Sequence, residues 1–439
     1  MMKPYSSYKN TNIEWLEQIP NLWEVLPLKR VIDKFVDYRG HTPNKTDSGI
    51  LLITARNIRD GHLDFDKSRE HIAEEDYDSW MVRGMPEKGD VMVTTEAPLG
   101  AIAQIESENV ALAQRLILLK ANKNRMNNTF IKYYFLSQFG QNMLLSEGTG
   151  STAIGIKASK FYNINIIIPP ISEQQAIADF LDRKTTQIDT LIEKKQRQID
   201  LLQEQRTALI NHAVTKGLNP DVRMKDSGVD WLGEIPSHWE SSKLKFLVDI
   251  RYGLGQPPKE LENGLPIIRA TNVERGKIVS KDMVYIDPSD VPPSRNAILK
   301  ENEIIVVRSG AYTADSAIVT KEYSGAVAGY DMVVTPTSIS AQLLAYAFLS
   351  HYVLKNQLYL QRMRAAQPHL NAEELGDTLI VYPPSEKEQI EIENYLDDTT
   401  KKISETIART NEQIDLLREY RTALISEAVT GKIDVRIAV

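Results

Sequence analysis

The segment Gln198-Ile-Asp-Leu-Leu202, continued by Arg206-Thr-Ala-Leu-Ile210 and Ala213-Val-Thr215, lies near the middle of a chain of 439 residues. It returns with a shift of 215 residues (from 198 to 413) as Gln413-Ile-Asp-Leu-Leu417, Arg421-Thr-Ala-Leu-Ile425 and Ala428-Val-Thr430. A second pair of matching segments lies near the start of each half, Glu14-Trp-Leu-Glu-Gln-Ile-Pro-Asn-Leu-Trp-Glu24 and Asp230-Trp-Leu-Gly-Glu-Ile-Pro-Ser-His-Trp-Glu240. The duplication predicts two related domains, each long enough to bury its own core.

The repeated segments fall in two predicted long helices. Residues 173–215 follow Pro169-Pro170 and contain no Gly or Pro, with Ser172 as the expected N-cap and Glu173 in the first turn. The second helix follows Pro383-Pro384, with Ser385 as the expected cap. Both helices carry a stripe of residues at alternating spacings of four and three, apolar at most of its positions, which is typical of a coiled-coil seam. The seam residues are Ile188, Ile192, Ile199, Leu202, Leu209, Ile403, Ile407, Ile414, Leu417 and Leu424.

One helix cannot bury such a stripe alone, so we expect the two helices to pair with each other. If the ends of the second globular segment lie close together, the second helix must run back along the first. The predicted fold class is therefore α/β, with two similar α/β domains at opposite ends of an antiparallel two-helix spacer. About 40 residues at 1.5 Å per residue give a spacer of roughly 60 Å.

The expected domain boundaries follow from the helices and the breakers beside them. We expect a first α/β domain over 1–168, a first spacer helix over 169–215, a linker over 216–227, a second α/β domain over 228–382, a second spacer helix over 383–430 and a tail over 431–439. Strands are predicted at 50–53, 91–93, 116–119, 304–307 and 332–334, and further helices at 128–145 and 341–360.

Composition limits the class of protein. The chain has no cysteine, which fits a reducing compartment and excludes thiolate metal sites. No apolar run approaches the roughly 20 residues of a membrane span, so we expect a cytoplasmic protein. The net charge is −7, but the stretches 173–215 (7 acidic, 6 basic) and 385–430 (11 acidic, 6 basic) account for most of it. The domains are therefore near neutral, and a local basic face on them is possible.

Enzyme motifs are missing from the sequence. It contains no Gly-x-Gly-x-x-Gly and no phosphate-binding loop, and Gly148-Thr-Gly150 and Gly253-Leu-Gly255 lack a third glycine. The histidines are scattered, which argues against a preformed zinc site. The double prolines also lack the flanking residues that amino-methyltransferases place around a flipped base. We therefore expect no catalytic residue and no metal site.

Residues able to pair with base edges were sought on predicted loops, because Arg suits guanine and Asn or Gln suits adenine. In the first domain the candidates are Arg56, Asn57, Arg59, Thr94, Thr95, Arg115, Thr149, Ser151 and Thr152. In the second they are Arg269, Asn272, Arg308, Ser309, Tyr312, Arg362, Arg364, Gln367 and His369. The group Arg362, Arg364, Gln367 and His369 is the densest. For any single candidate, a solvated surface charge or a turn residue is the competing interpretation.

Two further sets of residues have a structural interpretation. The repeated tryptophans Trp15, Trp23, Trp231 and Trp239 are expected in the cores rather than against bases. Arg206 and Arg421 occupy matching seam positions, where each is expected to pair with a carboxylate across the helices; the alternative is that they face a partner protein.

Together, the Val229-to-Glu240 opening, the helix entry Ile168-Pro-Pro-Ile-Ser-Glu-Gln-Gln-Ala-Ile177 and the repeated helical segment resemble the specificity subunit of type I restriction-modification systems. The resemblance covers essentially the whole chain. The second helix entry, Pro384-Ser-Glu-Lys-Glu-Gln389, departs from the pattern by one extra residue, which should shift the start of that helix slightly.

The resemblance implies a non-catalytic subunit with two target-recognition domains, one for each half of a bipartite site in double-stranded DNA. It implies two methyltransferase subunits docked on the spacer, further motor-nuclease subunits, and S-adenosylmethionine on the methyltransferase subunits but no cofactor on this chain. Two alternatives remain at this stage. One is a coiled-coil scaffold whose globular ends bind proteins, and the other is a DNA-modifying enzyme of unrecognised type.

Overall fold

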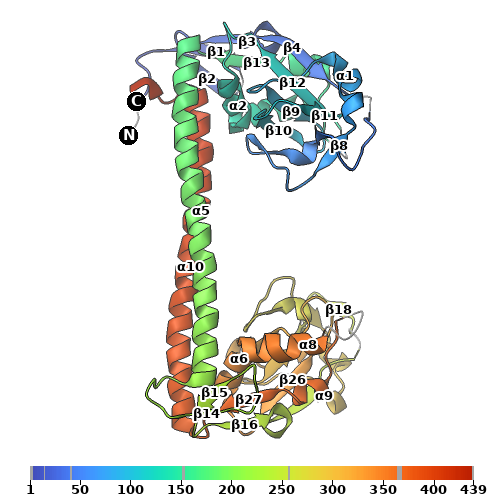
Figure 1. Ribbon diagram of the computed structural model, residues 1–439, viewed down its shortest axis with the longest axis vertical. Coiled ribbons are helices and arrows are strands. Elements are labelled where there is room, and N and C mark those ends of the chain that lie inside the picture. The colour runs from blue at the N-terminus through green and yellow to red at the C-terminus, as the bar shows by residue number, and fades with distance from the viewer. Residues whose placement is uncertain are drawn as a thin grey trace. The chain divides into compact units, whose positions relative to one another are not determined.

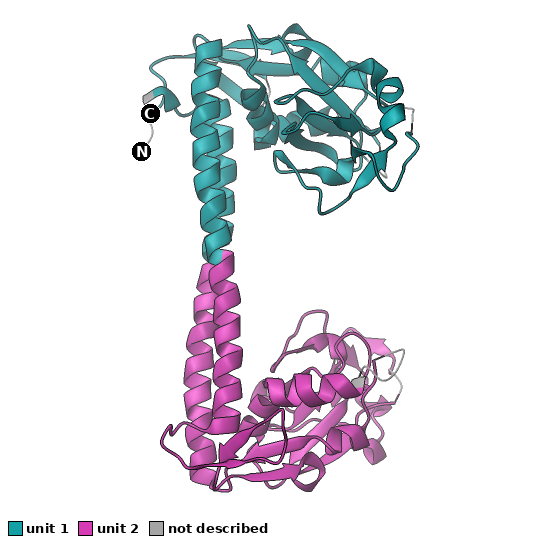
Figure 2. Ribbon diagram, viewed as in Figure 1, with its two compact units in different colours: residues 1–195, 411–439 teal, residues 196–410 magenta. Residues whose placement is uncertain are grey.

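The structure is a computed structural model that describes residues 3–13, 15–39, 42–150, 154–255, 258–362 and 368–437 (Figure 1). The chain divides into two compact units (Figure 2). Unit 1 contains residues 1–195 and 411–439, and unit 2 contains residues 196–410. Each unit is an α/β domain together with one part of each long helix, so each duplicated half of the sequence contributes its domain to one unit and divides its long helix between the two.

Unit 1 contains a four-stranded sheet of order β10-β9-β12-β4, a three-stranded sheet of order β11-β5-β8, and small antiparallel pairs. Its strands are β1 (Tyr8–Ile13), β2 (Leu16–Pro20), β3 (Glu24–Pro27), β4 (Ile32–Asp37), β5 (Ile50–Ile53), β6 (Ile58–Arg59), β7 (His62–Leu63), β8 (Glu70–Ile72), β9 (Val91–Thr95), β10 (Leu99–Gln104), β11 (Val110–Leu112), β12 (Leu116–Ala121) and β13 (Asn165–Ile168). Its short helices are α1 (Tyr77–Trp80), α2 (Asn128–Leu136), α3 (Gln138–Ser146) and α4 (Ala158–Tyr162).

Unit 2 repeats this topology. The sheet β17-β26-β23-β24 has the same strand order as β4-β12-β9-β10, and the sheet β18-β22-β19-β25 contains a parallel pair, β19–β25, that matches β5–β11. The strands are β14 (Met224–Asp226), β15 (Glu234–Pro236), β16 (Glu240–Lys243), β17 (Val248–Tyr252), β18 (Glu260–Leu261), β19 (Leu265–Ile268), β20 (Val273–Glu274), β21 (Lys277–Ile278), β22 (Val284–Ile286), β23 (Ile304–Val306), β24 (Ser316–Ile318), β25 (Val327–Ala328), β26 (Met332–Pro336) and β27 (Leu379–Tyr382). The short helices are α6 (Ala341–Leu349), α7 (His351–Val353), α8 (Tyr359–Arg362) and α9 (Ala372–Gly376).

The two long helices are α5 (Ile171–Lys216) and α10 (Glu386–Val429). In unit 1, Asp189 of α5 pairs with Arg421 of α10, and Lys195, one to two turns further along α5, donates to Gln413, about two turns back along α10. Residues further along α5 therefore contact residues earlier in α10, which shows that the two helices are antiparallel in unit 1. In unit 2 the end of α5 shares a hydrophobic cluster with the start of α10, as an antiparallel pair requires.

The seam was predicted correctly, because all of its ten residues are buried or half-buried. Ile210 and Ile425, which lie just beside the predicted seam, are only 3% and 1% exposed. They belong to the hydrophobic clusters that also contain domain side chains, so the buried face of each helix is wider than a coiled-coil seam alone.

The start of α5 differs from the prediction, whereas the start of α10 agrees with it. Ser172 is the second residue of α5 rather than its cap, whereas Ser385 immediately precedes α10. A buried glutamine fixes each entry. The side-chain amide of Gln174 donates to the Pro169 carbonyl oxygen, and that of Gln389 donates to the Pro383 carbonyl oxygen. The acceptor lies five residues back in the first case and six in the second, which accommodates the extra residue.

Both predicted domain helices are interrupted by a serine. The helix expected over 128–145 breaks at Ser137 into α2 and α3, and that expected over 341–360 breaks at Ser350, after α6. Each serine has extended backbone torsions, and its hydroxyl donates back to a carbonyl oxygen, that of Tyr134 or that of Ala347. Such local side-chain bonds compete with the helical ladder. After α7, residues Leu354–Leu358 form a π-helical turn.

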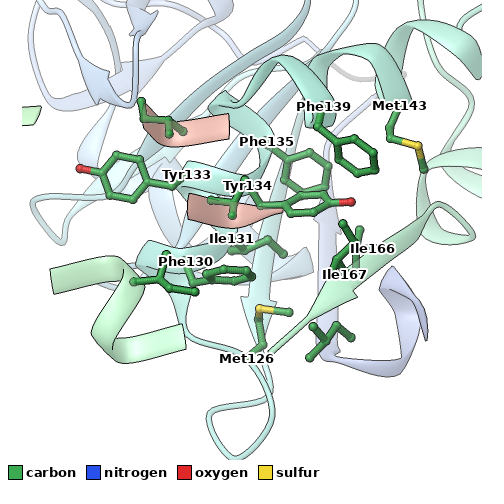
Figure 3. Close-up of a cluster of buried hydrophobic side chains, with 14 of the residues drawn as sticks. Met126, Phe130, Ile131, Tyr133, Tyr134, Phe135, Phe139, Met143, Ile166 and Ile167 are labelled. Atoms are coloured by element: carbon green, nitrogen blue, oxygen red, sulfur yellow. The ribbon is translucent and has the colours of Figure 1, made fainter. Parts of the chain in front are cut away.

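The core of unit 1 lies where α2 packs against the strands and the long helices (Figure 3). Tyr134 and Tyr133 point in opposite directions from α2, and Phe130 and Ile131 fill the space between the helix and its neighbours. Trp23 and Trp239 are fully buried, as expected, whereas Trp15 and Trp231 are 45% and 44% exposed, so the prediction that all four tryptophans are core residues was wrong for these two.

The segments expected to be a linker and a tail are part of the units. Residues Met224–Asp226 form β14, which pairs with β15. At the other end of the chain, Val435 is completely buried in unit 1, the Asp434 N–H donates to the Lys3 carbonyl oxygen at 2.8 Å, and the Tyr8 hydroxyl donates to the Gly431 carbonyl oxygen at 3.0 Å. The two ends of the described chain therefore meet, and both contribute to the first domain.

Candidate nucleic-acid interface

The loops of unit 1 that carry polar candidates gather where β9 and β12 meet. The N–H of Thr95, the last residue of β9, donates to the Arg115 carbonyl oxygen at 2.9 Å. Glu96 and Thr149 each form a β-bridge with Gly155. Three segments that lie far apart in the sequence are thus held together by backbone bonds.

The exposed feature of this cluster is an ion pair. Nε of Arg115 lies 3.0 Å from Oε1 of Glu96, with the two side chains 51% and 45% exposed. Arg115 has a left-handed backbone (φ +76°), so it projects from a turn and not from the strand. A guanidinium and a carboxylate side by side offer both a fork of donors and an acceptor, which are the groups that read guanine and cytosine.

The two threonines of β9 serve the fold. The Thr94 hydroxyl donates to the Pro98 carbonyl oxygen at 2.5 Å and accepts from the Ala101 N–H at 2.8 Å, and the Thr95 hydroxyl donates to the Arg115 carbonyl oxygen at 3.2 Å. Both residues are buried, at 0% and 1% exposure. The base contacts expected of these two residues are therefore not supported.

Unit 2 builds the same loop cluster at the end of β23. The Leu370 N–H donates to the Arg308 carbonyl oxygen at 2.8 Å, Ser309 forms a β-bridge with His369, and the Arg308 N–H donates to Oδ1 of Asp331 at 3.1 Å. Ser309 and His369 are half-buried beside Arg308. Tyr312, on the same loop, is 49% exposed. The structure thus brings four of the candidates together.

Arg308 is held between two aromatic rings. Its guanidinium carbon lies 4.6 Å from the ring centroid of Tyr252 and 4.2 Å from that of Tyr330. Such cation–π contacts fix the plane of the guanidinium. The sequence analysis missed both tyrosines, because Tyr252 ends β17 and Tyr330 precedes β26, far from Arg308 in the sequence.

Asp331, which accepts a hydrogen bond from the Arg308 backbone N–H, is itself buried. The residue is 2% exposed, and burial raises the pKa of its carboxyl to about 6, against the lowering effect of the Arg308 N–H and guanidinium. Gly253 approaches the backbone between β25 and β26 so closely that a Cβ would lie 2.2 Å from the Gly329 carbonyl oxygen. Glycine at position 253 is thus explained by a close backbone contact.

Arg269 joins the unit 2 cluster through the parallel strands. The Gly329 N–H donates to the Ile268 carbonyl oxygen at 2.9 Å, and a Cβ on Gly329 would lie 3.6 Å from Cγ of Arg269. The Arg269 guanidinium itself donates to the Asp282 carbonyl oxygen at 2.8 Å. Arg269 therefore lies beside Tyr330, but one terminal nitrogen of its guanidinium already donates to a backbone carbonyl oxygen.

Asn57 and Asn272 have the same structural role in the two units. The Asn57 side-chain amide donates to the Asp64 and Ser68 carbonyl oxygens, and its Oδ1 accepts from the Thr54 N–H. Asn272 makes the equivalent bonds to Val279, Lys281 and Arg269. Both side chains are 0% exposed and fully bonded, so they close a loop and are not available to an adenine.

Arg56 and Arg59 are exposed but form a separate region. Arg59 belongs to the β6–β7 hairpin, whose Gly61 bridges to Ala103 near the far end of β10 from Thr95. Ser151, Thr152, Arg364 and Gln367 lie outside the described residues, as does the side chain of Arg362. Most of the group that was densest in the sequence is therefore not placed.

Within the described ranges, no three His, Asp or Glu side chains converge to form a group that could hold a metal ion. None of the described helices combines the length and the apolar character that crossing a bilayer requires.

Comparison with known proteins places this geometry in a family. The family described as "Type I restriction modification DNA specificity domain" matches residues 83–201 and 236–416, one match in each half of the chain. The type I restriction enzyme EcoKI specificity subunit of Escherichia coli (strain K12) is 24% identical over 93% of this chain and 91% of its own length. The MjaVIII specificity subunit of Methanocaldococcus jannaschii is 25% identical over 72% of each chain.

Solved structures share the fold. A chain reported under "Structural basis underlying complex assembly and conformational transition of the type I R-M system" superposes with a TM-score of 0.73 at 16% identity, covering 94% of this chain and 99% of its own. The HsdS subunit from Thermoanaerobacter tengcongensis gives a TM-score of 0.53 at 17% identity, over 94% and 98% of the two chains. With a family match in both halves and two α/β units that share one topology, this chain belongs to the type I restriction-modification DNA specificity family.

Proposed function

We propose that this chain is the sequence-reading subunit of a type I restriction-modification complex and that each α/β domain reads one half of a bipartite site in double-stranded DNA. One observation carries the proposal. The two units build the same loop cluster at the ends of β9 and β23, yet fill it with different groups, the Arg115–Glu96 pair in one and the Arg308 stack in the other. A shared frame with divergent polar groups is what two half-sites of different sequence require.

The proposal includes partner subunits on the long helices. Leu201 of α5 and Leu416 of α10 are separated by the repeat shift of 215 residues (from 201 to 416), and they are 49% and 56% exposed. Single exposed apolar residues are common, but two at equivalent positions support a repeated docking surface. We assign this surface to two methyltransferase subunits, with motor-nuclease subunits joining the complex through them.

The chemistry then belongs to the partners. In this proposal the methyltransferase subunits carry S-adenosylmethionine, this chain binds no cofactor and catalyses no reaction, and the complex works in the cytoplasm. Reading two half-sites at once multiplies the two affinities through effective concentration. Neither domain then needs to bind DNA tightly alone, which fits a chain whose net charge is −7.

The test is base-resolution mapping of N6-methyladenine in a methylation-free host. The host expresses this chain together with its methyltransferase subunit, each of them alone, and the pair with Leu201→Asp and Leu416→Asp. We expect a bipartite motif with the wild-type pair only, and loss of methylation in the double variant without loss of folding. Methylation by this chain alone would contradict the non-catalytic assignment, and absence of a motif with the pair would contradict the reading role.

A further inference from the structure

The Arg308 guanidinium is contacted by two aromatic rings. The ring centroids of Tyr252 and Tyr330 lie 4.6 and 4.2 Å from the guanidinium carbon. Among the described residues, no acidic side chain lies within ion-pair distance of this guanidinium, whereas Arg39, Arg115 and Arg251 each have such a partner. The in-plane N–H groups at the tip of Arg308 are therefore not used by a protein carboxylate.

One of the two rings is itself held in place. The Tyr252 hydroxyl accepts a hydrogen bond from the Ala372 N–H at 2.9 Å, which ties that ring to the start of α9. Tyr330 is 48% exposed, and its ring centroid lies 4.2 Å from the guanidinium carbon. The Arg308 backbone is fixed by Asp331 and Leu370. The plane of the guanidinium is thus set before any ligand arrives, which reduces the entropy lost on binding.

A planar fork with fixed orientation suits one ligand above others. Guanine presents O6 and N7 side by side in the major groove, and arginine binds them bidentately. A phosphate also accepts a bidentate fork. Both half-sites carry phosphates, however, whereas unit 1 has Thr95 at the position that matches Arg308. The divergence at this position therefore favours a base edge over the DNA backbone.

Unit 1 provides an internal comparison. In the ladders, Val306 pairs with Met332 as Val93 pairs with Ile117. The positions that match Arg308 and Tyr330 are therefore Thr95 and Arg115. Unit 1 carries a threonine where unit 2 carries Arg308, so an effect of Arg308 should be confined to one half-site.

We propose that Arg308 reads a guanine in the half-site recognised by the second domain, with Tyr252 and Tyr330 as positioning residues. This inference rests on the proposed function and deepens it, by naming a residue that determines specificity and the base that it takes.

The first experiment maps methylated motifs of the complete complex, formed with its methyltransferase subunit, for wild type, Arg308→Lys, Arg308→Ala, Tyr330→Leu and Tyr330→Phe. Lysine at position 308 keeps the positive charge but lacks the two parallel N–H donors of a guanidinium. Phenylalanine at position 330 keeps the aromatic ring. We expect Arg308→Lys, Arg308→Ala and Tyr330→Leu to relax one G·C position in one half-site, while the other half-site and the Tyr330→Phe motif stay unchanged. Arg295→Lys, an exposed arginine of the same domain, is the matched control.

The second experiment does not depend on methylation. Binding of the wild-type complex is measured to the same duplex with 7-deazaguanine at the relaxed position, which removes N7 and leaves every phosphate in place. We expect affinity to fall roughly 5- to 100-fold for wild type and to be unchanged for Arg308→Ala. A melting curve of each variant confirms that it is folded.

The outcomes separate the two proposals. No motif with the wild-type pair would overturn the proposed function and this inference with it. A bipartite wild-type motif that stays the same in Arg308→Lys and Arg308→Ala would overturn only the guanine reading. Uniform weakening at all sequences, with no response to 7-deazaguanine, would also overturn it and assign Arg308 to a phosphate.

Discussion

The Tyr133 hydroxyl donates a hydrogen bond to Oδ1 of Asp182 at 2.7 Å, which joins α2 to α5 in unit 1. In unit 2, Tyr346 of α6 makes the same bond to Asp397 of α10 at 2.5 Å. A threonine one turn further, Thr185 or Thr400, lies within hydrogen-bond distance of each hydroxyl. The duplication therefore extends to the bond that attaches each domain to its long helix.

Replacing Tyr133 or Tyr346 by phenylalanine should loosen the corresponding attachment. Each variant leaves its carboxylate without this donor, and a hydrogen bond to a charged group contributes about 1.5–3 kcal/mol. We expect a loss of about 1.5 kcal/mol in the free energy of unfolding, because the aspartates are partly exposed. Chemical denaturation measures it, with Tyr420→Phe on the exposed face of α10 as the control. A loss no larger than that of the control would mean that the bond contributes nothing.

Asn57→Ala and Asn272→Ala should impair folding and not base recognition. Each substitution leaves buried carbonyl and N–H groups without a partner, at about 1–3 kcal/mol for each group. We expect the melting temperature to fall for both variants. At temperatures where they remain folded, the methylation motif should be that of the wild type. A changed base preference in a folded variant would restore these residues to the DNA interface.

Asp331→Asn should stabilise unit 2 increasingly as pH rises. An aspartate in the unfolded chain ionises near pH 4, whereas burial raises the pKa of Asp331 to about 6. Between these values the unfolded chain has lost its proton and the folded chain has not, so wild-type stability falls as pH rises through this window. Asparagine keeps an oxygen for the Arg308 N–H but has no proton to lose.

We therefore expect no gain from Asp331→Asn near pH 4 and a gain of up to about 3 kcal/mol at pH 7. Urea denaturation at pH 4, 5, 6 and 7, with amide exchange used to follow unit 2, gives the profile. A gain that does not vary with pH would show that the carboxyl of Asp331 titrates as it does in the unfolded chain.

Ending the chain after Thr430 should destabilise the first domain. The deletion removes Val435, which is fully buried, the bond from Asp434 to Lys3 and the acceptor of the Tyr8 hydroxyl. Burial of a valine alone contributes about 1.5–3 kcal/mol. We expect faster amide exchange over residues 3–23 and unchanged exchange in unit 2, with Val435→Ala giving an intermediate effect. Equal loss of protection in both units would contradict this local role.

Much of the fold could be predicted from the sequence, because repeated letters and helical periodicity are local signals. The seam from Ile188 to Leu424 needed only the spacing of apolar residues, and the pairing of Arg421 with a carboxylate followed from its place on that seam. Arg206 occupies the matching position, but the residue that corresponds to Asp189 is Ser404, and no ion pair of Arg206 appears in the described part of the chain. The repeat in the sequence therefore predicted that both arginines lie on the seam, but not which of them has a carboxylate partner.

The candidate site depended on tertiary structure. Four of the predicted residues have side chains suited to reading bases, but these side chains form hydrogen bonds with the backbone of their own domain; they are Asn57, Asn272, Thr94 and Thr95. Arg308 was one candidate among many until the sheet brought Tyr252 and Tyr330 against its guanidinium. Local patterns in the sequence were enough to predict two alike halves and two long helices, because those depend on residues close together along the chain. Which polar groups remain free was decided only by packing, because a hydrogen bond or a ring contact joins residues that the chain separates by tens of positions.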